Sequence, residues 1–170
     1  MNWFFITVAY SGLAPKAPGT AGSFVALLLG VFILIYLGEE TLFYATLLAM
    51  IAGVKMIDNY EAQSQSHDDK RIVIDELVGM WLALAIAPGV QFDPTSLLHV
   101  ENGTLIQIVL SFVFFRIYDI KKPSYIGRID RDVKGGIGVM GDDVLAGIAA
   151  GITAALLWQG WLELAKMFQI

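Results

Sequence analysis

The chain has 170 residues, the length of one domain, but its composition is not that of a soluble protein. Hydrophobic residues make up 56% of it and charged residues 16%, with a mean hydropathy of +0.65, whereas soluble chains contain roughly 25% charged residues. The sequence has no cysteine, which excludes disulfides, thiolate nucleophiles and zinc–thiolate sites, and its net charge of −5 identifies no partner. We therefore expect a membrane protein, in which the positions of the charged residues along the chain are more informative than the net charge.

The first eight residues are apolar but lack a basic segment and a clear cleavage site. We expect them to be retained rather than removed as a signal peptide. Trp3, Phe4 and Phe5 are suited to anchoring the chain at a membrane interface.

The segment Ser11–Ser23 contains two prolines and three glycines. Pro15 and Pro18 oppose helix formation, and the glycines permit tight turns. Thr20 or Ser23 is suited to capping the helix that follows. Alternatively, the backbone N–H groups around Gly19, Thr20 and Ser23 would bind a phosphate at a helix N-terminus.

Five apolar runs follow, and they predict an all-α, polytopic membrane bundle of about five short transmembrane helices in a single domain, residues 1–170. The runs are Ala21–Leu37, Thr41–Ile57, Ile72–Ala87, Thr104–Ile120 and Val144–Leu164. Seventeen residues of helix cover roughly 26 Å, close to the hydrocarbon thickness of about 30 Å. The first, second and fifth runs have no polar face, which a soluble bundle would need.

The loops between the runs predict the topology. Gly38–Glu40 and Gly89–Gly103 carry no Lys or Arg, whereas Asp58–Arg71 and Lys121–Gly141 carry most of the positive charge. If the N-terminus is inside and the C-terminus outside, ten of the eleven Lys and Arg residues lie on the cytoplasmic side or at the inner ends of spans, and only Lys166 lies outside. The unusual polar clusters then also converge on the inner face, where we expect the functional site.

Two adjacent carboxylate pairs, Asp75-Glu76 and Asp142-Asp143, lie next to apolar runs. An Asp at mid-membrane costs about 2.5–3.5 kcal/mol, and less near the interface. Stabilisation of such a pair by the helix macrodipole is usually worth only about 0.3–1 kcal/mol. A divalent cation would relieve the repulsion between adjacent carboxylates, and oxygen ligands favour Mg²⁺. We therefore predict these four residues as Mg²⁺ ligands and, with Asp119, as catalytic residues.

Cationic side chains close to these acids are candidates for binding substrate. Arg116 and Asp119 are three residues apart and share a helix face, so they either form an intrahelical ion pair, or Arg116 instead binds a phosphate together with Lys122. Arg131 is a further candidate for binding phosphate, although its segment, with Asp132 and Lys134, also has the composition of a solvated loop.

Three other features complete the candidate site. Gly135–Gly138 is expected to be a turn that returns the chain to the site. His67 and Asp68 precede the third run, near the carboxylates, and are candidates for proton transfer; His99 falls in the outer loop and receives no role. Gly147, Ala150, Gly151 and Ala154 predict a small-residue face that packs closely against another helix.

Four blocks in chain order resemble the phosphatidylglycerophosphatase A family of bacterial membrane lipid phosphatases: GLAPKAPGTAGS, HDDKRIVIDELVGMW, FRIYDIKKP and IDRDVKGGIGVMGDDVLAG. The resemblance covers most of the chain and implies Mg²⁺-dependent removal of the terminal phosphate of phosphatidylglycerol phosphate, giving phosphatidylglycerol, in the bacterial inner membrane. It maps the positions shared by the family onto Pro18, Gly19, Thr20, Gly22, Ser23, His67, Asp68, Asp75, Glu76, Gly79, Arg116, Asp119, Lys122, Pro123, Asp130, Arg131, Gly135, Gly136, Asp142 and Asp143.

Among phosphatase chemistries, the sequence favours direct metal-assisted hydrolysis by water. A thiolate mechanism is excluded because cysteine is lacking, and the motifs typical of aspartyl-phosphate and phosphohistidine enzymes are not present in the sequence. We expect a phospholipid substrate in the membrane and no nucleic acid, and homo-oligomerisation is not readable from the sequence.

Two alternatives remain open at this point. One is a phosphatase for another lipid phosphate. The other is a small ion-coupled or proton-coupled transporter, for which intramembrane carboxylates are equally expected. A transporter needs such groups near mid-membrane with access from both sides, whereas these acids gather at the inner ends of the runs.

Overall fold

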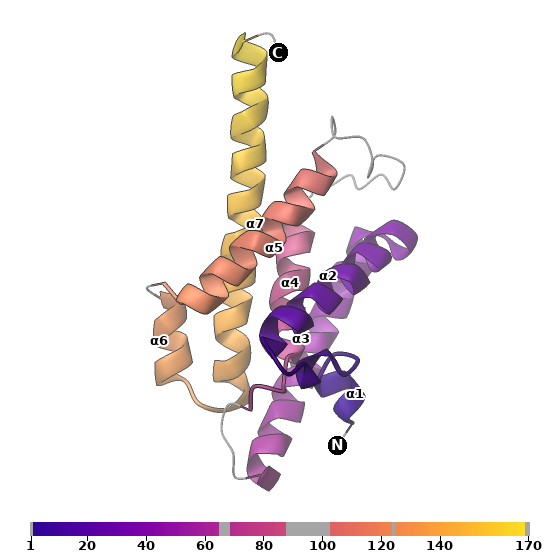
Figure 1. The fold of residues 1–170 in the computed structure, drawn as a ribbon, viewed down its shortest axis with the longest axis vertical. Helices are drawn as coiled ribbons and strands as arrows, with labels where there is room; N and C mark the ends of the chain where they lie inside the picture. Colours follow the sequence, from indigo (N-terminus) through magenta and orange to yellow (C-terminus); the bar gives the residue numbers. More distant parts are fainter. Residues whose placement is uncertain (1, 65–68, 88–102, 124, 169–170) are drawn as a thin grey trace.

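The computed structural model describes residues 2–64, 69–87, 103–123 and 125–168, and every regular element within them is helical (Figure 1). In chain order the elements are α1 (Trp3–Ile6), the 3-10 turn η1 (Ser11–Leu13), α2 (Pro18–Leu37), α3 (Glu39–Ser64), α4 (Ile74–Ile86), α5 (Thr104–Lys121), α6 (Tyr125–Asp132) and α7 (Gly135–Phe168). The predicted all-α class is confirmed.

The five long helices alternate in direction along the chain, as predicted. Figure 1 shows the N-termini of α2, α4 and α7 at the same end of the bundle as the C-termini of α3 and α5. Elements that are far apart in the sequence therefore meet at this end. The C-terminus of α7 projects from the opposite end.

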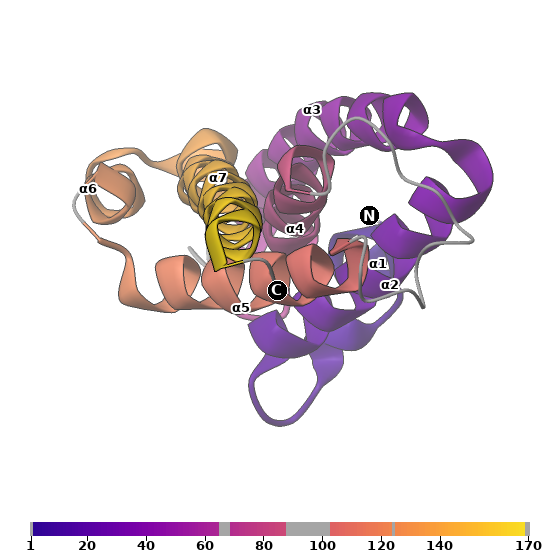
Figure 2. The ribbon, with the colours of Figure 1, turned by 90° about the horizontal axis from the view of Figure 1, so that it is seen from above.

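The shortest of the long helices, α4, is the centre of the bundle. It packs against α2, α3, α5 and α7, and Figure 2 shows it surrounded by them. Val78, Met80, Ala83 and Leu84, on different sides of α4, are fully buried. A helix that is apolar on all sides is typical of a core position. Since its neighbours are protein, α4 need not have the length of a lipid-exposed span.

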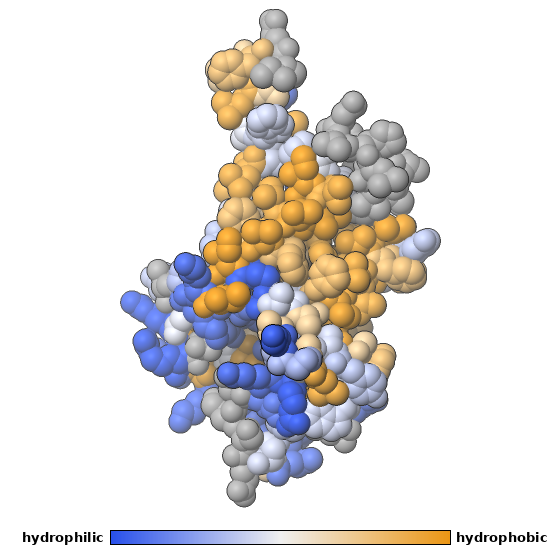
Figure 3. Space-filling model, in the orientation of Figure 1, coloured by the Kyte–Doolittle hydropathy of each residue, from blue (hydrophilic) through white to orange (hydrophobic). Residues whose placement is uncertain are grey.

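Among the described residues, three helices are long and apolar enough to cross a membrane: α2, α3 and α7. At 13 residues α4 is only about 20 Å long, and α5 carries charged residues in its last two turns. The expected number of about five spans therefore stays a prediction. Figure 3 shows apolar side chains covering the middle and upper surface, with hydrophilic side chains gathered at the lower end, where the N-termini of α2, α4 and α7 lie.

The helix boundaries correct two expectations. Helix α2 begins at Pro18, three residues earlier than the predicted run, because proline is tolerated in the first turn, where its missing N–H costs no hydrogen bond. The segment 125–132 was expected to be part of a polar loop, but it forms α6, a short amphipathic helix that packs on α7.

The third correction concerns the predicted turn Gly135–Gly138, which is instead the first turn of α7. Gly135 has a φ of +75°, and Asp58 Oδ1 accepts a hydrogen bond of 2.7 Å from the N–H of Gly136. An aspartate of α3 thus caps α7 from outside the helix. Asp142 and Asp143 consequently lie about two turns inside α7 rather than at its start.

Candidate metal and phosphate site

Helix α4 places Asp75 and Glu76 in its first turn. The N–H of Val73, just before the helix, donates to the carbonyl of Ile6 at 3.0 Å, which holds the start of α4 to the N-terminal segment. The helix dipole favours negative charge in a first turn. However, Asp75 Oδ1 and Glu76 Oε2 are buried with no hydrogen-bond partner among the described residues. Buried charged oxygens without partners are costly, so the macrodipole alone does not account for this pair.

Helix α7 brings Asp142 and Asp143 to the same place from the opposite side. Asp142 is 5% exposed and Asp143 2%, and Asp143 Oδ1 also lacks a partner within the described ranges. The two helices touch through their backbones here, because a Cβ added at Gly79 of α4 would lie 2.6 Å from the carbonyl oxygen of Asp143. Glycine at position 79 therefore lets the two carboxylate pairs approach each other.

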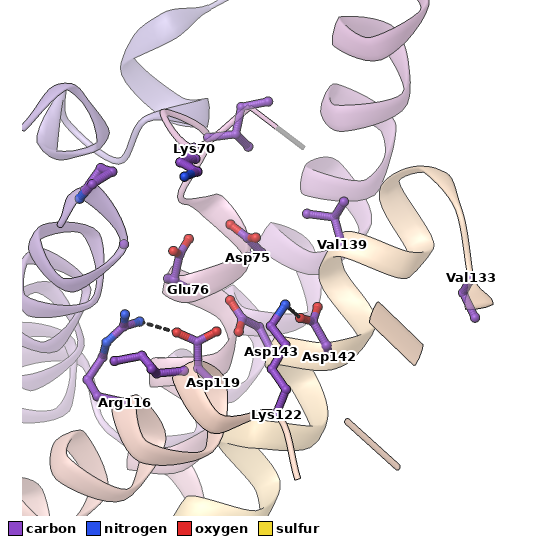
Figure 4. A pocket seen from close by; sticks show the side chains of 14 residues that line it. Lys70, Asp75, Glu76, Arg116, Asp119, Lys122, Val133, Val139, Asp142 and Asp143 are labelled. Atoms are coloured by element: carbon purple, nitrogen blue, oxygen red, sulfur yellow. Dashed lines mark hydrogen bonds and ion pairs between the residues drawn. The ribbon is translucent and has the colours of Figure 1, made fainter. Parts of the chain in front are cut away.

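The carboxylates form two groups that share Asp143. Oxygens of Asp75, Glu76 and Asp143 lie within 4.8 Å of one another, and so do oxygens of Asp119, Asp142 and Asp143. Figure 4 shows the five carboxylates converging from α4, α5 and α7. Three of the five carboxylates have a buried oxygen without a partner in the described part of the chain, and such an all-oxygen set fits a divalent cation such as Mg²⁺.

Two cations flank the acids. Arg116 Nη1 is 2.6 Å from Asp119 Oδ2, so the pair predicted on one face of this helix is formed. The same nitrogen donates to the hydroxyl of Ser23 at 3.0 Å, which links α5 to α2. Lys122 Nζ is 2.7 Å from Asp142 Oδ2. Both cations therefore balance carboxylate charge and sit where a phosphate bound beside the acids would meet them.

These side chains line a cavity of about 750 Å³ at the polar end of the bundle. Its lining residues are Pro18, Gly19, Lys70, Ile72, Asp75, Glu76, Arg116, Asp119, Ile120, Lys122, Val133, Val139, Asp142 and Asp143. Five carboxylates face three cations in this lining, an excess of negative charge that a divalent cation would offset.

Glycine at position 19 makes room for Glu76. A Cβ added at Gly19 would lie 2.4 Å from Glu76 Oε1 and 3.5 Å from Arg116 Nη2. The first turn of α2, for which the sequence offered phosphate binding as the alternative to a helix cap, thus borders a carboxylate and a guanidinium. Ser23 is fully buried and donates to the carbonyl of Gly19 at 2.8 Å while it accepts from Arg116, so it holds the guanidinium in place.

Some predicted residues are not brought to the cavity. Thr20 does not line it. Arg131 is exposed and pairs with Asp132 at 2.9 Å, away from the acids. The predictions for His67 and Asp68, and the outer loop with His99, lie outside the described residues.

The structure adds residues that sequence reasoning missed. Tyr60 and Arg71 both donate hydrogen bonds to Asp69, and the guanidinium of Arg71 lies 5.1 Å from the ring of Trp3. The hydrogen bonds from Arg71 hold the pKa of Asp69 well below its usual range. This cluster fixes the segment that carries Lys70 and leads into α4, and it turns Trp3 toward α3. Phe4 and Phe5 remain exposed, as an interfacial anchor would require.

The fold and the cavity define an all-α integral membrane protein with an acidic, cation-flanked cavity at one end of its bundle. A sequence model of the family described as Phosphatidylglycerophosphatase A matches residues 4–158. The chain is 35% identical over 152 residues to a Phosphatidylglycerophosphatase A of Haemophilus influenzae. The aligned region covers 89% of this chain and 85% of that protein. The chain is 34% identical to a protein of the same name from Escherichia coli, over 88% of this chain and 80% of that protein.

A third relative, from Bacteroides thetaiotaomicron, is named Putative phosphatidylinositol-3-phosphatase and is 33% identical over 86% of each chain. No solved structure matches. The chain belongs to the phosphatidylglycerophosphatase A family, and it is therefore an enzyme of the phosphatase class.

Proposed function

We propose that this chain removes the terminal phosphate of phosphatidylglycerol phosphate in a Mg²⁺-dependent reaction at the cytoplasmic face of the bacterial inner membrane. The observation that carries the proposal is a cluster of five carboxylates, flanked by Arg116 and Lys122 in one cavity. Three of the five have a buried oxygen without a partner among the described residues. The family and the names of two relatives support the substrate. The bias of Lys and Arg toward this end supports the orientation, with the N-terminus inside.

The residues divide by chemistry. Asp75, Glu76, Asp142 and Asp143 hold the cation, with Asp119 beside them, and Asp143 belongs to both groups of acids. Bound Mg²⁺ supplies Lewis-acid polarisation of phosphoryl oxygens and a lowered pKa of bound water.

The protein side chains orient the substrate and move a proton. Arg116 and Lys122 neutralise charge on the phosphoryl group as it is transferred. Water attacks phosphorus, the bond from phosphorus to the glycerol oxygen breaks, and the products are inorganic phosphate and the glycerol hydroxyl of phosphatidylglycerol. A carboxylate of the cluster or His67 accepts the proton of the attacking water.

The transporter alternative is disfavoured by the place of the charges. Every acid of the cluster lies at one end of the bundle, and the middle of the bundle is mostly apolar on the face that Figure 3 shows. The relative named Putative phosphatidylinositol-3-phosphatase makes a phosphorylated phosphatidylinositol the second candidate substrate.

The test is phosphate release by the purified protein in mixed micelles. We expect release from phosphatidylglycerol phosphate that chelator abolishes and added Mg²⁺ restores. Hydrolysis of phosphatidylinositol 3-phosphate alone would keep the reaction class and replace the substrate. Failure to hydrolyse any phosphomonoester would overturn the proposal.

Gly19→Ala tests the packing around Glu76. The added Cβ would displace Oε1 of Glu76, so we expect a several-fold higher Mg²⁺ concentration for half-maximal activity in a protein that still folds. The control is Gly160→Ala, since, apart from its chain neighbours and its own helix backbone, no atom of the described residues lies within 4 Å of a Cβ added there. An unchanged Mg²⁺ requirement in Gly19→Ala would show that the position of Glu76 does not matter to the metal.

A further inference from the structure

Lys70 lines the cavity but was given no role by the sequence. It lies four residues before the first residue of α4, outside the helix that carries Asp75 and Glu76. Figure 4 shows Lys70 on the far side of these two acids from Arg116 and Lys122. Its side chain is exposed, whereas Arg116 and Lys122 are partly buried. Lys70 is thus the cation at the outer rim of the cavity.

The three cations of the lining differ in their partners. Arg116 is paired with Asp119 at 2.6 Å, and Lys122 with Asp142 at 2.7 Å. Lys70 forms no hydrogen bond or ion pair with any other described residue, although its neighbours Asp69 and Arg71 are paired with each other. The segment around Lys70 is therefore fixed, while its ammonium group, with three N–H donors, is available to an anion.

We propose that Lys70 is a substrate-binding residue that holds the phosphomonoester at the outer rim of the cavity and then the released inorganic phosphate. This inference rests on the proposed function. The terminal phosphate is the end of such a lipid farthest from its acyl chains. With the chains on the apolar side of the bundle, that end points to the rim where Lys70 lies.

The alternative is a nonspecific role, in which Lys70 only adds to the positive charge near the membrane surface. Lys121 provides the matched control, because it is also exposed and is adjacent to Lys122 but does not line the cavity. General electrostatic attraction would be reduced to a similar degree by neutralising either lysine.

The experiment compares the wild type with Lys70→Gln, Lys70→Arg and Lys121→Gln. Phosphatidylglycerol phosphate hydrolysis gives KM and kcat, and inorganic phosphate serves as a competitive inhibitor. Binding of inorganic phosphate alone, in the presence of Mg²⁺, is followed by ³¹P NMR titration. We expect Lys70→Gln to raise KM, the inhibition constant and the dissociation constant about three- to fivefold, as for an exposed charge pair, with little change in kcat. Lys70→Arg should retain most of the affinity.

Equal effects of Lys70→Gln and Lys121→Gln, or no effect of Lys70→Gln, would overturn the inference. The two proposals fail separately. If the wild type releases no phosphate from the lipid but binds inorganic phosphate through Lys70, the substrate is wrong and the role of Lys70 stands. If the lipid is hydrolysed but Lys70→Gln leaves the affinity for inorganic phosphate unchanged, the proposed function stands and only the role of Lys70 is wrong.

Discussion

Asp143→Asn is expected to reduce phosphate release by about 100-fold or more without unfolding the protein. Asp143 is the residue shared by the two groups of acids, so its loss would remove a proposed oxygen ligand from both. Changes to groups that merely support metal ligands already cost about 10- to 100-fold, and loss of a ligand should cost at least as much. Asp75→Asn should act in the same direction.

The sign of the stability change makes this prediction specific. Asp143 is 2% exposed and its Oδ1 has no partner among the described residues, so without metal this carboxyl group is buried with one oxygen uncompensated. Replacing it with a neutral isostere lowers that cost. Metal-free Asp143→Asn should therefore unfold at the same temperature as metal-free wild type, or higher. Added Mg²⁺ should stabilise the wild type and not the variant.

Asp132→Asn is the control, since Asp132 is exposed and its partner Arg131 lies outside the cavity. It should keep wild-type activity and the wild-type response to Mg²⁺. If Asp143→Asn and Asp75→Asn both kept wild-type turnover, the assignment of the metal site would be wrong.

The main outlines of the fold and the site could be predicted because they rest on charge and apolarity along the chain. Apolar runs predict the five long helices, and the positions of Lys and Arg predict which helix ends lie together at one end of the bundle. Burying an acidic pair next to an apolar run costs free energy, so such a pair in the sequence indicates a function. For this reason Asp75-Glu76 and Asp142-Asp143 could be predicted to form one site. The structure brings both pairs to one cavity.

The parts that were wrong depend on local geometry that composition does not show. Gly135 and Gly136 are typical of a turn, but they begin α7 because Asp58, nearly eighty residues earlier, accepts the hydrogen bond that caps the helix. Lys70 is an ordinary polar residue in the sequence, and only the path of the chain before α4 brings it to the cavity. The pattern of apolar and polar residues along the chain does not predict contacts between such distant residues.

One signal in the sequence was available and was missed. Both helices that carry an adjacent acidic pair contain an aspartate followed four residues later by glycine, Asp75 with Gly79 and Asp143 with Gly147. Residues four apart lie on the same helix face, so each aspartate has a glycine one turn further along on the side that faces the partner helix. The repeated spacing indicates two helices that cross at their glycines and present their acids to each other.

Gly147→Ala tests that crossing and is expected to reduce activity by more than tenfold. A Cβ at position 147 would lie 2.2 Å from the carbonyl oxygen of Gly79, a backbone atom that cannot rotate away. Helices α4 and α7 must therefore separate where they cross, one turn from Asp75 and Asp143. Misplacement of catalytic groups by about 1 Å can cost about 100-fold in rate. Phosphate release in mixed micelles, at saturating Mg²⁺, measures the loss.

Stability distinguishes this effect from a simple change of residue. Alanine favours a helix over glycine by about 1 kcal/mol, so without the close contact Gly147→Ala would stabilise α7. Overpacking of a tight interface instead costs about 1–3 kcal/mol, and we expect a lower thermal midpoint in detergent with unchanged helical circular dichroism. Gly160→Ala, in the same helix but with open space around it, should keep its activity and be as stable as the wild type or more so. Full activity and a raised midpoint in Gly147→Ala would show that the helices do not meet through these glycines, and the approach of the two acidic pairs would then need another cause.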